Sequence, residues 1–418
     1  MKKLGVLALT TALTAGSAFA QSDLEVIKQK IKILEEQNQQ LIDEIADLKQ
    51  QVAIPELAQK QFAGMGFAAS KVYFSPKGLS IGGYGEIIYQ NWEKSSKKDM
   101  TDTYRFIPYI GYKFTDNIVL NSEIEFEHTD EAKVEFLYID FLLNKYFNIR
   151  VGNQLIPVGI TNLTHEPIFF NSVNRPEVET KIIPSTWNEN GIILFSTADK
   201  FTYYVGIVNG FYYNAKGKGF SADSWVKGGK QGGGKAYAED LAFVGRFDFK
   251  GIDGLTAGVS AYRGNSGQGD KDTTGNKIDG TVSIYDVHFV YSWKGFEVKG
   301  LYVKGFLSDA DKISTALGDT IGKEVYGYYL NLAYDILPLI NKDTNLCLPI
   351  FVRYERFNTQ EKVANGFTAD KANDKTVWTV GFNFKPHPNI VLKADYQFRD
   401  NEAGGESDVF ELGMGFIF

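Results

Sequence analysis

The chain ends on the stretch SDVFELGMGFIF, residues 407–418, in which large apolar side chains recur at every second position. Alternate side chains of a strand point to opposite faces, so one face of this stretch is apolar. That face consists of Phe410, Leu412, Met414, Phe416 and Phe418. A water-soluble sheet would leave this face exposed and the edge of the strand unpaired. The stretch therefore predicts a strand that faces lipid and pairs along its edge.

The same alternation continues through the chain from Leu79 onward. Segments of roughly 8 to 15 residues alternate in polarity and are separated by turn-forming residues, as expected for strands. We predict sixteen strands, at 79–92, 102–114, 118–128, 133–143, 147–156, 190–198, 201–210, 237–250, 254–263, 281–293, 295–306, 323–337, 347–358, 376–385, 389–400 and 408–418.

The connections between these segments alternate between short and long. The short ones lie at 115–117, 144–146, 199–200, 251–253, 294, 338–346 and 386–388. The long ones include 157–189, 211–236, 264–280, 307–322 and 359–375. Short turns at one end, long loops at the other and an even number of strands are typical of an outer-membrane barrel. We therefore predict an all-β transmembrane barrel of sixteen antiparallel strands over 79–418, whose last strand closes against 79–92.

The polar face of each strand indicates what the barrel encloses. In 389–400 the residues Lys393, Asp395 and Arg399 share one face, opposite Leu392 and Phe398. A basic residue facing lipid at the bilayer midplane would cost roughly 2–4 kcal/mol, so the charged face must line a wet lumen. Barrels of sixteen strands are wide enough to keep an aqueous channel. The pattern favours a channel that passes small hydrophilic solutes.

Three segments precede the barrel. Residues 1–20 carry Lys2 and Lys3, then an apolar run and a small-residue ending, which predicts a cleaved signal peptide. Residues 22–54 predict a coiled coil, and residues 55–78, which begin with a helix-ending Pro55, predict a short linker. No later stretch is long and apolar enough to predict a transmembrane helix.

The coiled coil follows a heptad pattern in which apolar residues step by three and four positions. The residues expected to mediate self-association are Ile27, Ile31, Leu34, Asn38, Leu41, Ile45 and Leu48. Asn38 occupies a core position, where an amide fixes register and orientation rather than binding a ligand. Ile and Leu at the two core positions favour a dimer when the helix is considered alone.

Composition excludes several classes of function. Loss of Lys2 and Lys3 with the signal peptide changes the formal net charge from −7 to −9, which argues against nucleic acid as a partner. The single cysteine, Cys347, rules out an intramolecular disulfide. None of the four histidines lies in a catalytic or zinc-binding motif. We therefore expect no enzyme activity, no cofactor and no metal.

Several stretches together resemble the phosphate-selective porin O and P family. They are the first strand LSIGGYGEIIYQNW, the segment FNIRVGNQLIPVGI that leads into a long third loop, and the final aromatic strand. The resemblance covers residues 79–418. It implies a channel that favours anions such as phosphate or organic acids. Members that carry a coiled coil are trimeric, so the resemblance implies a homotrimer in place of the dimer suggested by the heptads.

In sixteen-stranded porins the third loop folds inward and narrows the channel, which is what the resemblance implies for residues 157–189. The charged candidates in this loop are His165, Glu166, Arg175, Glu177, Glu179 and Lys181. An alternative is a loop that lies on the rim with its charges solvated.

Strand alternation places a second set of charged candidates on the lumen wall. The basic members are Arg105, Lys113, Arg150, Arg246, Arg353, Lys393 and Arg399. The acidic members are Glu123, Glu125, Glu127, Asp248, Asp286, Glu297, Glu355 and Asp395. These charges could create a transverse field that orients solutes, or could pair with one another and only stiffen the wall. The run Glu123-x-Glu125-x-Glu127 could bind a divalent metal but more often pairs with neighbouring Arg or Lys.

The sequence thus predicts an outer-membrane porin with its coiled coil in the periplasm. The alternative is an envelope-organising protein that uses the barrel as an anchor and the coiled coil as a tether to the cell wall.

Overall fold

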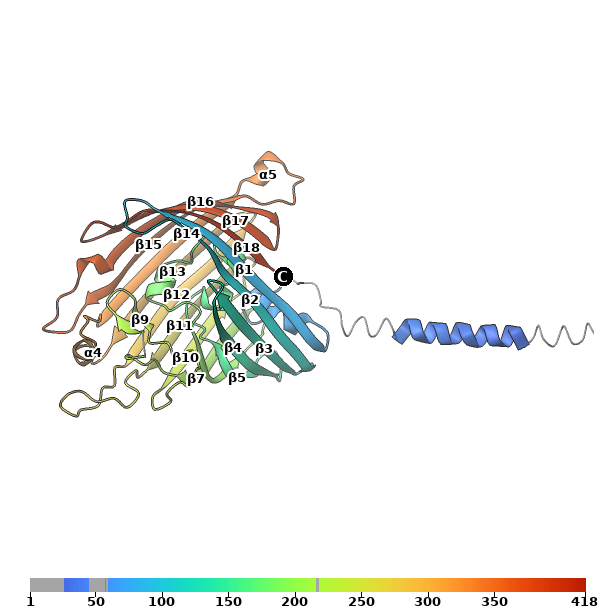
Figure 1. Ribbon diagram of the computed structural model, residues 1–418, viewed down its shortest axis with the longest axis horizontal. Helices are drawn as coiled ribbons and strands as arrows, with labels where there is room; N and C mark the ends of the chain where they lie inside the picture. The colour runs from blue at the N-terminus through green and yellow to red at the C-terminus, as the bar shows by residue number, and fades with distance from the viewer. Residues whose placement is uncertain (1–25, 45–56, 58, 216–217) are drawn as a thin grey trace, which may run out of the picture. The chain divides into compact units, whose positions relative to one another are not determined.

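The strands predicted from residue 79 onward close into a barrel in the computed structural model, which describes residues 26–44, 57, 59–215 and 218–418 (Figure 1). The sixteen barrel strands are β1 (Gly78–Trp92), β2 (Met100–Thr115), β3 (Ile118–Glu127), β4 (Glu131–Leu142), β5 (Asn148–Leu155), β6 (Asn188–Phe195), β7 (Phe201–Asn209), β10 (Leu241–Phe249), β11 (Leu255–Gly264), β12 (Val282–Trp293), β13 (Phe296–Leu307), β14 (Glu324–Asp335), β15 (Pro349–Lys362), β16 (Asp374–His387), β17 (Ile390–Asn401) and β18 (Val409–Ile417). The predicted fold class and strand number are confirmed.

All barrel strands pair antiparallel with their sequence neighbours, and β1 closes the ring against β18. Tyr84 pairs with Ile417 and Trp92 with Val409 across this seam. Gly83 and Phe418 also exchange two backbone hydrogen bonds, of 3.0 and 2.9 Å. The final strand therefore has no free edge, as its sequence predicted.

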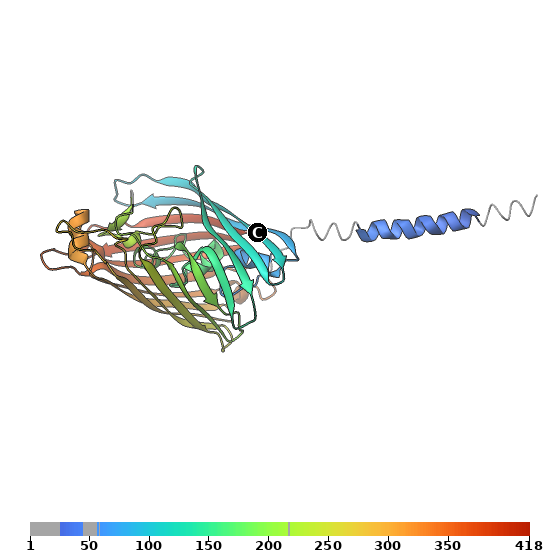
Figure 2. The same cartoon turned by 90° about the horizontal axis from the view of Figure 1, so that it is seen from below.

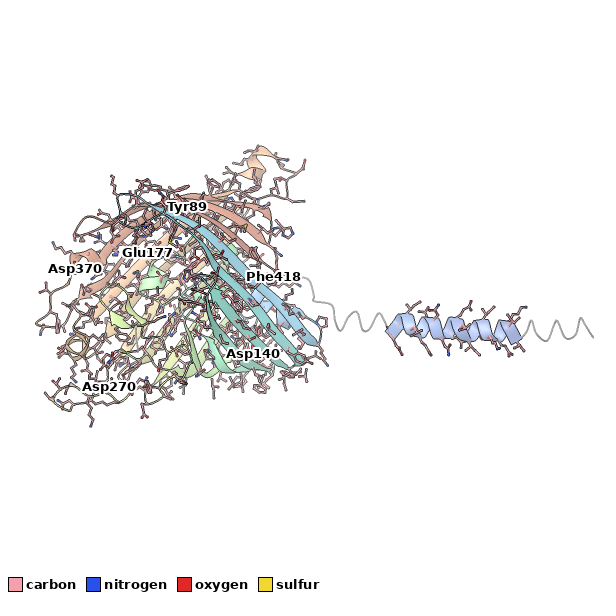
Figure 3. All side chains as sticks on the ribbon, viewed as in Figure 1. Tyr89, Asp140, Glu177, Asp270, Asp370 and Phe418 are labelled. Carbon is pink, nitrogen blue, oxygen red and sulfur yellow. The ribbon has the colours of Figure 1, made fainter. Side chains whose placement is uncertain are left out.

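Short turns gather at one end of the barrel and long loops at the other (Figure 2). The longest short-end connection carries α5 (Leu337–Ile340), while α4 (Ala310–Leu317), η3 (Lys371–Asn373) and the hairpin of β8 (Gly219–Ser221) and β9 (Trp225–Gly228) lie in long loops. Figure 3 labels Asp270 and Asp370 in long loops at the left and Phe418 towards the opposite end.

Alternation separates the two faces of the wall. The stripe Phe410, Leu412, Met414 and Phe418 is exposed on the outside, whereas Glu411 between them is fully buried inside. In β17, Leu392 and Phe398 are exposed outside while Lys393 and Asp395 are buried inside. The outer face is thus apolar and the inner face polar, which is the arrangement of a transmembrane barrel with a polar lumen.

Residues 55–78 are more than the linker that was predicted. Residues 59–75, here called the plug segment, contain α2 (Phe67–Phe74), which packs inside the barrel against β1, β2 and β3. The side chains of Ala68, Ala69 and Val72 are buried there. Gly111 on β2 permits this approach, because a Cβ at that position would lie 2.6 Å from Val72 Cγ2.

Polar contacts fix both ends of α2. The carboxylate of Glu166 accepts hydrogen bonds from the backbone N–H groups of Ala68 (3.2 Å) and Ala69 (3.0 Å), which supplies acceptors for the free donors at a helix start. At the other end, Lys113 donates to the carbonyl oxygens of Tyr73 (2.9 Å) and Ser75 (2.7 Å). The helix is therefore held by the wall and by the third loop together.

The chain divides into two compact units, residues 1–54 and residues 55–418, and the barrel belongs to the second. The described part of the first unit is a single helix over residues 26–44, with Ile27, Ile31, Leu34 and Leu41 about half exposed. Ile45, Leu48 and the predicted signal peptide lie outside the described residues. No helix among the described residues has the length and apolar character needed to cross a membrane.

Candidate functional site

Residues 156–187, here called the constriction loop, connect β5 to β6 and fold into the lumen. The loop carries η1 (Asn162–Thr164), η2 (Pro167–Phe169) and α3 (Val178–Lys181). Its predicted inward course is visible in its contacts with strands across the barrel. Backbone N–H groups at Val173 and Val178 donate to Asp395 (2.6 Å) and Glu355 (3.1 Å), respectively.

Basic side chains of the far wall hold the carbonyl groups of the constriction loop. Lys393 donates to the carbonyl oxygens of Phe170 (2.8 Å) and Ser172 (2.9 Å), and Lys299 donates to that of Phe169 (2.6 Å). Because each charge-assisted hydrogen bond here ends on the loop backbone, the wall positions the loop instead of presenting free charge to the lumen.

One buried carboxylate organises the inside of the loop. Glu179 accepts from the N–H groups of Ile160 and Thr161, both at 2.7 Å, and from the Thr161 hydroxyl at 2.9 Å. Tyr329 on β14 also donates its hydroxyl to Glu179 at 2.7 Å. Glu179 is therefore saturated with donors and serves to shape the loop.

The constriction loop divides the open space of the lumen. On the long-loop side lies a cavity of about 600 Å³, here called the vestibule. On the short-turn side, a cavity of about 230 Å³ reaches Gln61 and Gly64 of the plug segment. Between loop and far wall, beside Phe170, Tyr329 and Arg353, is a space of about 20 Å³, enough for roughly one water molecule. The loop thus narrows the lumen at this height.

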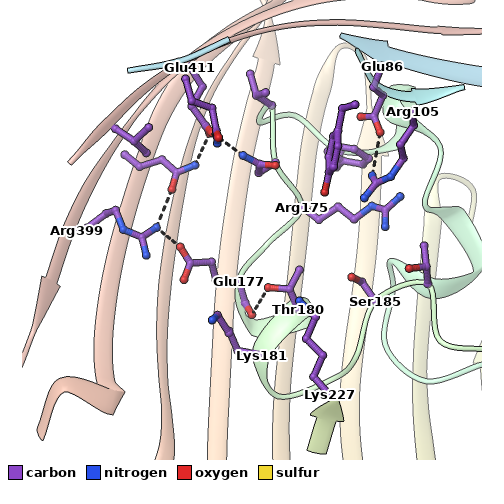
Figure 4. A pocket seen from close by; sticks show the side chains of 18 of the residues that line it. Glu86, Arg105, Arg175, Glu177, Thr180, Lys181, Ser185, Lys227, Arg399 and Glu411 are labelled. Atoms are coloured by element: carbon purple, nitrogen blue, oxygen red, sulfur yellow. Dashed lines mark hydrogen bonds and ion pairs between the residues drawn. The ribbon is translucent and has the colours of Figure 1, made fainter. Parts of the chain in front are cut away.

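Nine basic and six acidic side chains line the vestibule. Figure 4 shows part of this lining, with Arg105, Arg175, Lys181, Lys227 and Arg399 labelled among the basic residues. The basic ones are Lys97, Arg105, Lys133, Arg175, Lys181, Lys227, Lys230, Lys375 and Arg399. The acidic ones are Glu86, Glu127, Glu177, Asp223, Glu406 and Glu411. The lining is therefore mixed in sign, with an excess of positive charge.

Most vestibule carboxylates are paired with a cation. Arg105 binds Glu86 (3.0 Å) and Glu127 (2.9 Å), and Arg399 contacts Glu177. Lys181 and Lys375 both contact Asp223, and Lys375 lies 2.9 Å from Glu406. Glu411 instead accepts hydrogen bonds from the amide groups of Gln90, Asn174 and Gln397.

Four vestibule cations have no carboxylate within 4 Å among the described residues: Lys97, Arg175, Lys227 and Lys230. The Lys97 ammonium lies 3.7 Å from the centre of the Trp92 ring. Arg175 donates to the carbonyl oxygen of His165 at 3.0 Å, while its buried Nε–H has no partner in the described structure. The side-chain hydroxyls of Thr180 and Ser185 face the same space (Figure 4).

Two lysines of the vestibule, Lys227 and Lys230, have a lowered pKa. Burial lowers the pKa of Lys230 to about 8, although its ammonium group donates to the carbonyl oxygen of Ser185 at 2.9 Å. Burial, followed by repulsion from Lys181, also lowers the pKa of Lys227. Conversely, Asp223 keeps a lowered pKa because Lys181 and Lys375 overcome the effect of its burial. Positive charge is thus concentrated where little negative charge compensates it.

The structure sorts the charged residues predicted from sequence into two places. Those that line the vestibule are Arg105, Glu127, Arg175, Glu177, Lys181 and Arg399. Those engaged elsewhere are Lys113, Glu123, Glu125, Arg150, His165, Glu166, Glu179, Arg246, Arg353 and Lys393.

The engaged residues hold structure together. Arg150 forms a bidentate pair with Asp140, at 2.8 and 2.9 Å, beneath the plug segment. Arg246 donates to the carbonyl oxygen of Gly159, and Arg353 donates to the hydroxyl of Ser172. These contacts fit the alternative in which the charged side chains pair and stiffen the wall, and do not fit a free pore lining. Arg246 and Arg353 also bind groups of the constriction loop.

Sequence reasoning missed Lys227 and Lys230. They lie between β7 and β10, in the stretch VKGGKQGGGK at residues 226–235. Trp225 anchors this loop, because it is fully buried and donates its indole N–H to the carbonyl oxygen of Gly322 at 3.0 Å. A repeated lysine in a glycine-rich loop was the only available signal, and solvated loops show the same composition.

Comparisons with known proteins agree with this architecture. Residues 109–414 match the family described as phosphate-selective porin O and P. An uncharacterized protein of Aquifex aeolicus (strain VF5) is 37% identical over 388 residues, which cover 89% of this chain and 87% of that protein.

Solved structures share the fold at low sequence identity. The outer membrane channel DcaP of Acinetobacter baumannii superposes with a TM-score of 0.53 at 11% identity, covering 81% of this chain and 97% of that one. In vitro folded OmpT of Vibrio cholerae, in a structure described as a trimer form, gives a TM-score of 0.50 at 12% identity, with 82% and 100% covered.

Proposed function

Because this outer-membrane channel protein belongs to the phosphate-selective porin O and P family, we propose that the solutes it passes are small oxyanions such as phosphate or organic acids. The observation that carries the proposal is the set of uncompensated cations at the mouth of the constriction, above all Arg175 and Lys227. An arginine offers a planar fork of donors that matches a phosphate or carboxylate group.

The proposed path uses the vestibule as a selectivity site. An anion is attracted by the excess positive charge, loses part of its hydration shell, and exchanges it for the Arg175 guanidinium and the Lys227 ammonium. The hydroxyl of Ser185 provides a further donor beside these cations, whereas the Thr180 hydroxyl already donates to the carbonyl oxygen of Glu177 at 3.1 Å. The paired cations Lys181 and Arg399 then offer the next positions, because an arriving anion competes with Asp223 and Glu177 for them.

The test is single-channel recording in planar bilayers. The wild-type channel should prefer anions in a salt gradient, and millimolar phosphate or a dicarboxylate should reduce its chloride current by occupying the site. Arg175→Gln and Lys227→Gln should each shift the reversal potential towards cation preference and weaken block by phosphate. Lys235→Gln is the matched control, because Lys235 is exposed in the same loop and does not line the vestibule. A cation-preferring wild type would contradict the proposal.

We also propose that the protein is a trimer with its N-terminal helix in the periplasm. The half-exposed side chains of Ile27, Ile31, Leu34 and Leu41 form an apolar stripe that self-association would cover. The trimer form of the OmpT structure supports this stoichiometry over a dimer. Mass measurement of the detergent-solubilised full chain should give three copies, and protease added to intact cells should leave the helix uncut. Two copies, or cleavage from outside, would contradict it.

A further inference from the structure

Beneath the constriction loop, three side chains of metal-binding type converge on one point. They are Glu123 on β3, Glu135 on β4 and His165, which follows η1 in the loop. One ligand atom from each residue lies within 4.8 Å of the other two. All three residues are at most 1% exposed to solvent. The cluster therefore lies in the polar interior and is separate from the vestibule lining.

A β-bulge aims Glu135 into this cluster. Phe136 pairs with Glu123 and Val134 pairs with Ile124, so Glu135 is the extra residue between them. Regular alternation would put Glu135 on the outer face with Leu137, but the bulge turns it inward beside Phe136. Bulges are enriched beside functional sites, where they redirect a side chain. The strand is thus irregular at the one point that brings a second carboxylate to Glu123.

His165 is oriented as a ligand. Its Nδ1 lies 2.9 Å from the carbonyl oxygen of Asn162, which only accepts, so Nδ1 carries the hydrogen. In the neutral ring, Nε2 then presents a lone pair at 3.1 Å from Glu123 Oε1 and 3.3 Å from the Tyr109 hydroxyl. A lone pair opposite a carboxylate oxygen requires a proton or a cation between them. A backbone carbonyl on the other ring nitrogen is also how metal-binding histidines are held.

Three of the four carboxylate oxygens in the cluster lack a hydrogen-bond partner among the described residues. Glu123 Oε2 and both oxygens of Glu135 are buried without a hydrogen bond in the described part of the chain. Lys133 approaches Glu135 at 3.4 Å, but it lies 2.5 Å from Glu125 and its side chain is about half exposed. A buried carboxylate in this state is costly, and the cost is offset by a proton, by an opposite charge or by a bound metal ion.

We propose that Glu123, Glu135 and His165 bind a divalent transition-metal ion of the zinc class. One imidazole and two carboxylates suit a borderline cation such as Zn²⁺, whereas Ca²⁺ and Mg²⁺ prefer oxygen ligands alone. Three protein ligands leave a fourth position for a water molecule, and the Tyr109 hydroxyl lies nearby, 3.3 Å from His165 Nε2. The ion would join β3, β4 and the constriction loop, and through the neighbouring Glu166 it would also steady α2.

The test uses the full-length chain refolded in detergent either with a chelator or with Zn²⁺, followed by removal of loose metal and elemental analysis. Wild-type protein refolded with Zn²⁺ should retain about one ion per chain. Co²⁺ in place of Zn²⁺ should give the intense visible absorption of a four- or five-coordinate site. Glu135→Gln and His165→Asn should each weaken binding at least about tenfold. Glu297→Gln is the matched control, since it removes a lumen carboxylate paired with Lys299 at 3.0 Å.

Native-like gel mobility and the circular dichroism of the barrel establish that each variant is folded, and two independent ligand variants guard against the failure of one to fold. Retention of metal by both folded variants at the wild-type level would overturn the proposal. So would folded wild-type protein that retains no stoichiometric Zn²⁺ and gives only the pale spectrum of hydrated Co²⁺. Neither result bears on anion selectivity, which is measured in metal-free bilayers.

Discussion

Lys230 combines a position in the vestibule with a pKa lowered by burial to about 8. An unperturbed lysine keeps its charge to a pH above 10. The lowered pKa means that Lys230 is cationic below about pH 8 and neutral above it, so the vestibule loses positive charge as the pH rises through this value.

We predict that anion preference falls between pH 7 and pH 9, with its midpoint near pH 8, when reversal potentials are measured in a fixed salt gradient. Lys230→Arg should flatten this profile, because arginine stays protonated over the whole range. A wild-type profile that is already flat would show that Lys230 does not contribute to selectivity.

A second residue-scale prediction concerns Arg150, which is buried with Asp140 and lies 3.8 Å over the Tyr138 ring. Replacement by Met leaves the Asp140 carboxylate buried without its counter-charge. The free energy of unfolding should fall by about 3–5 kcal/mol. Urea titration of the refolded barrel in lipid vesicles measures this change.

The matched control is the double variant Arg150→Met/Asp140→Leu, which removes both charges. It should recover much of the lost stability, since replacing a whole buried pair by apolar groups is often nearly neutral. Equal losses in the single and double variants would mean that the pair does not act as a unit.

At the scale of elements, the plug segment fills part of the lumen that the strands alone would leave open. Tyr73 of α2 donates to Asp140 at 2.6 Å, and the Phe62 ring stacks on the Tyr73 ring at 3.7 Å. Deletion of residues 59–75 should therefore raise single-channel conductance, because it removes these side chains from the short-turn half of the lumen.

Gly111→Val gives a milder version of the same change, because a Cβ at this position meets Val72 and would displace α2. Deletion of 26–44, which lies in the other compact unit, is the control and should leave conductance unchanged. If the plug deletion folds and conducts like the wild type, the segment does not limit flow.

The strands could be predicted from sequence because lipid and water impose opposite demands on alternate residues, as in β17 and β18. The plug segment could not be predicted, because α2 contains no heptad pattern and no polar face that would distinguish it from a linker.

Glu135 was missed because alternation assumes a regular strand. The bulge opposite Glu123 moves the Glu135 side chain from the outer to the inner face of β4. The acidic run at 123, 125 and 127 was recognised in the sequence, but Glu125 forms an ion pair with Lys133 and Glu127 forms one with Arg105.

Within the constriction loop, the sequence shows which residues are charged, but it does not show which of them bind groups of the loop itself and which line the vestibule. Glu177 and Arg175 line the vestibule, whereas Glu179, two residues from Glu177, is enclosed by donors from Thr161 and Tyr329. The difference depends on the turn of α3 and on strands far away in the chain, neither of which leaves a local pattern.

At the scale of the whole molecule, the apolar outer face predicts a depth-dependent response to charge. Leu330 is exposed near the middle of β14, and Trp293 is exposed at the end of β12. Leu330→Arg should lower the free energy of unfolding in lipid by about 2–4 kcal/mol, and Trp293→Arg by about 0–1 kcal/mol. Equal effects at the two positions, or no effect in either, would contradict the assignment of this face to the bilayer.

The position of the plug segment has a consequence for how the molecule is made. The segment precedes β1 in the chain, yet it lies within a ring whose seam joins β1 to β18. After that seam has closed, α2 could reach its place only through an open end of the barrel. We therefore expect α2 to pack against β1, β2 and β3 before β18 pairs with β1, so that assembly of the wall and filling of the lumen are coupled.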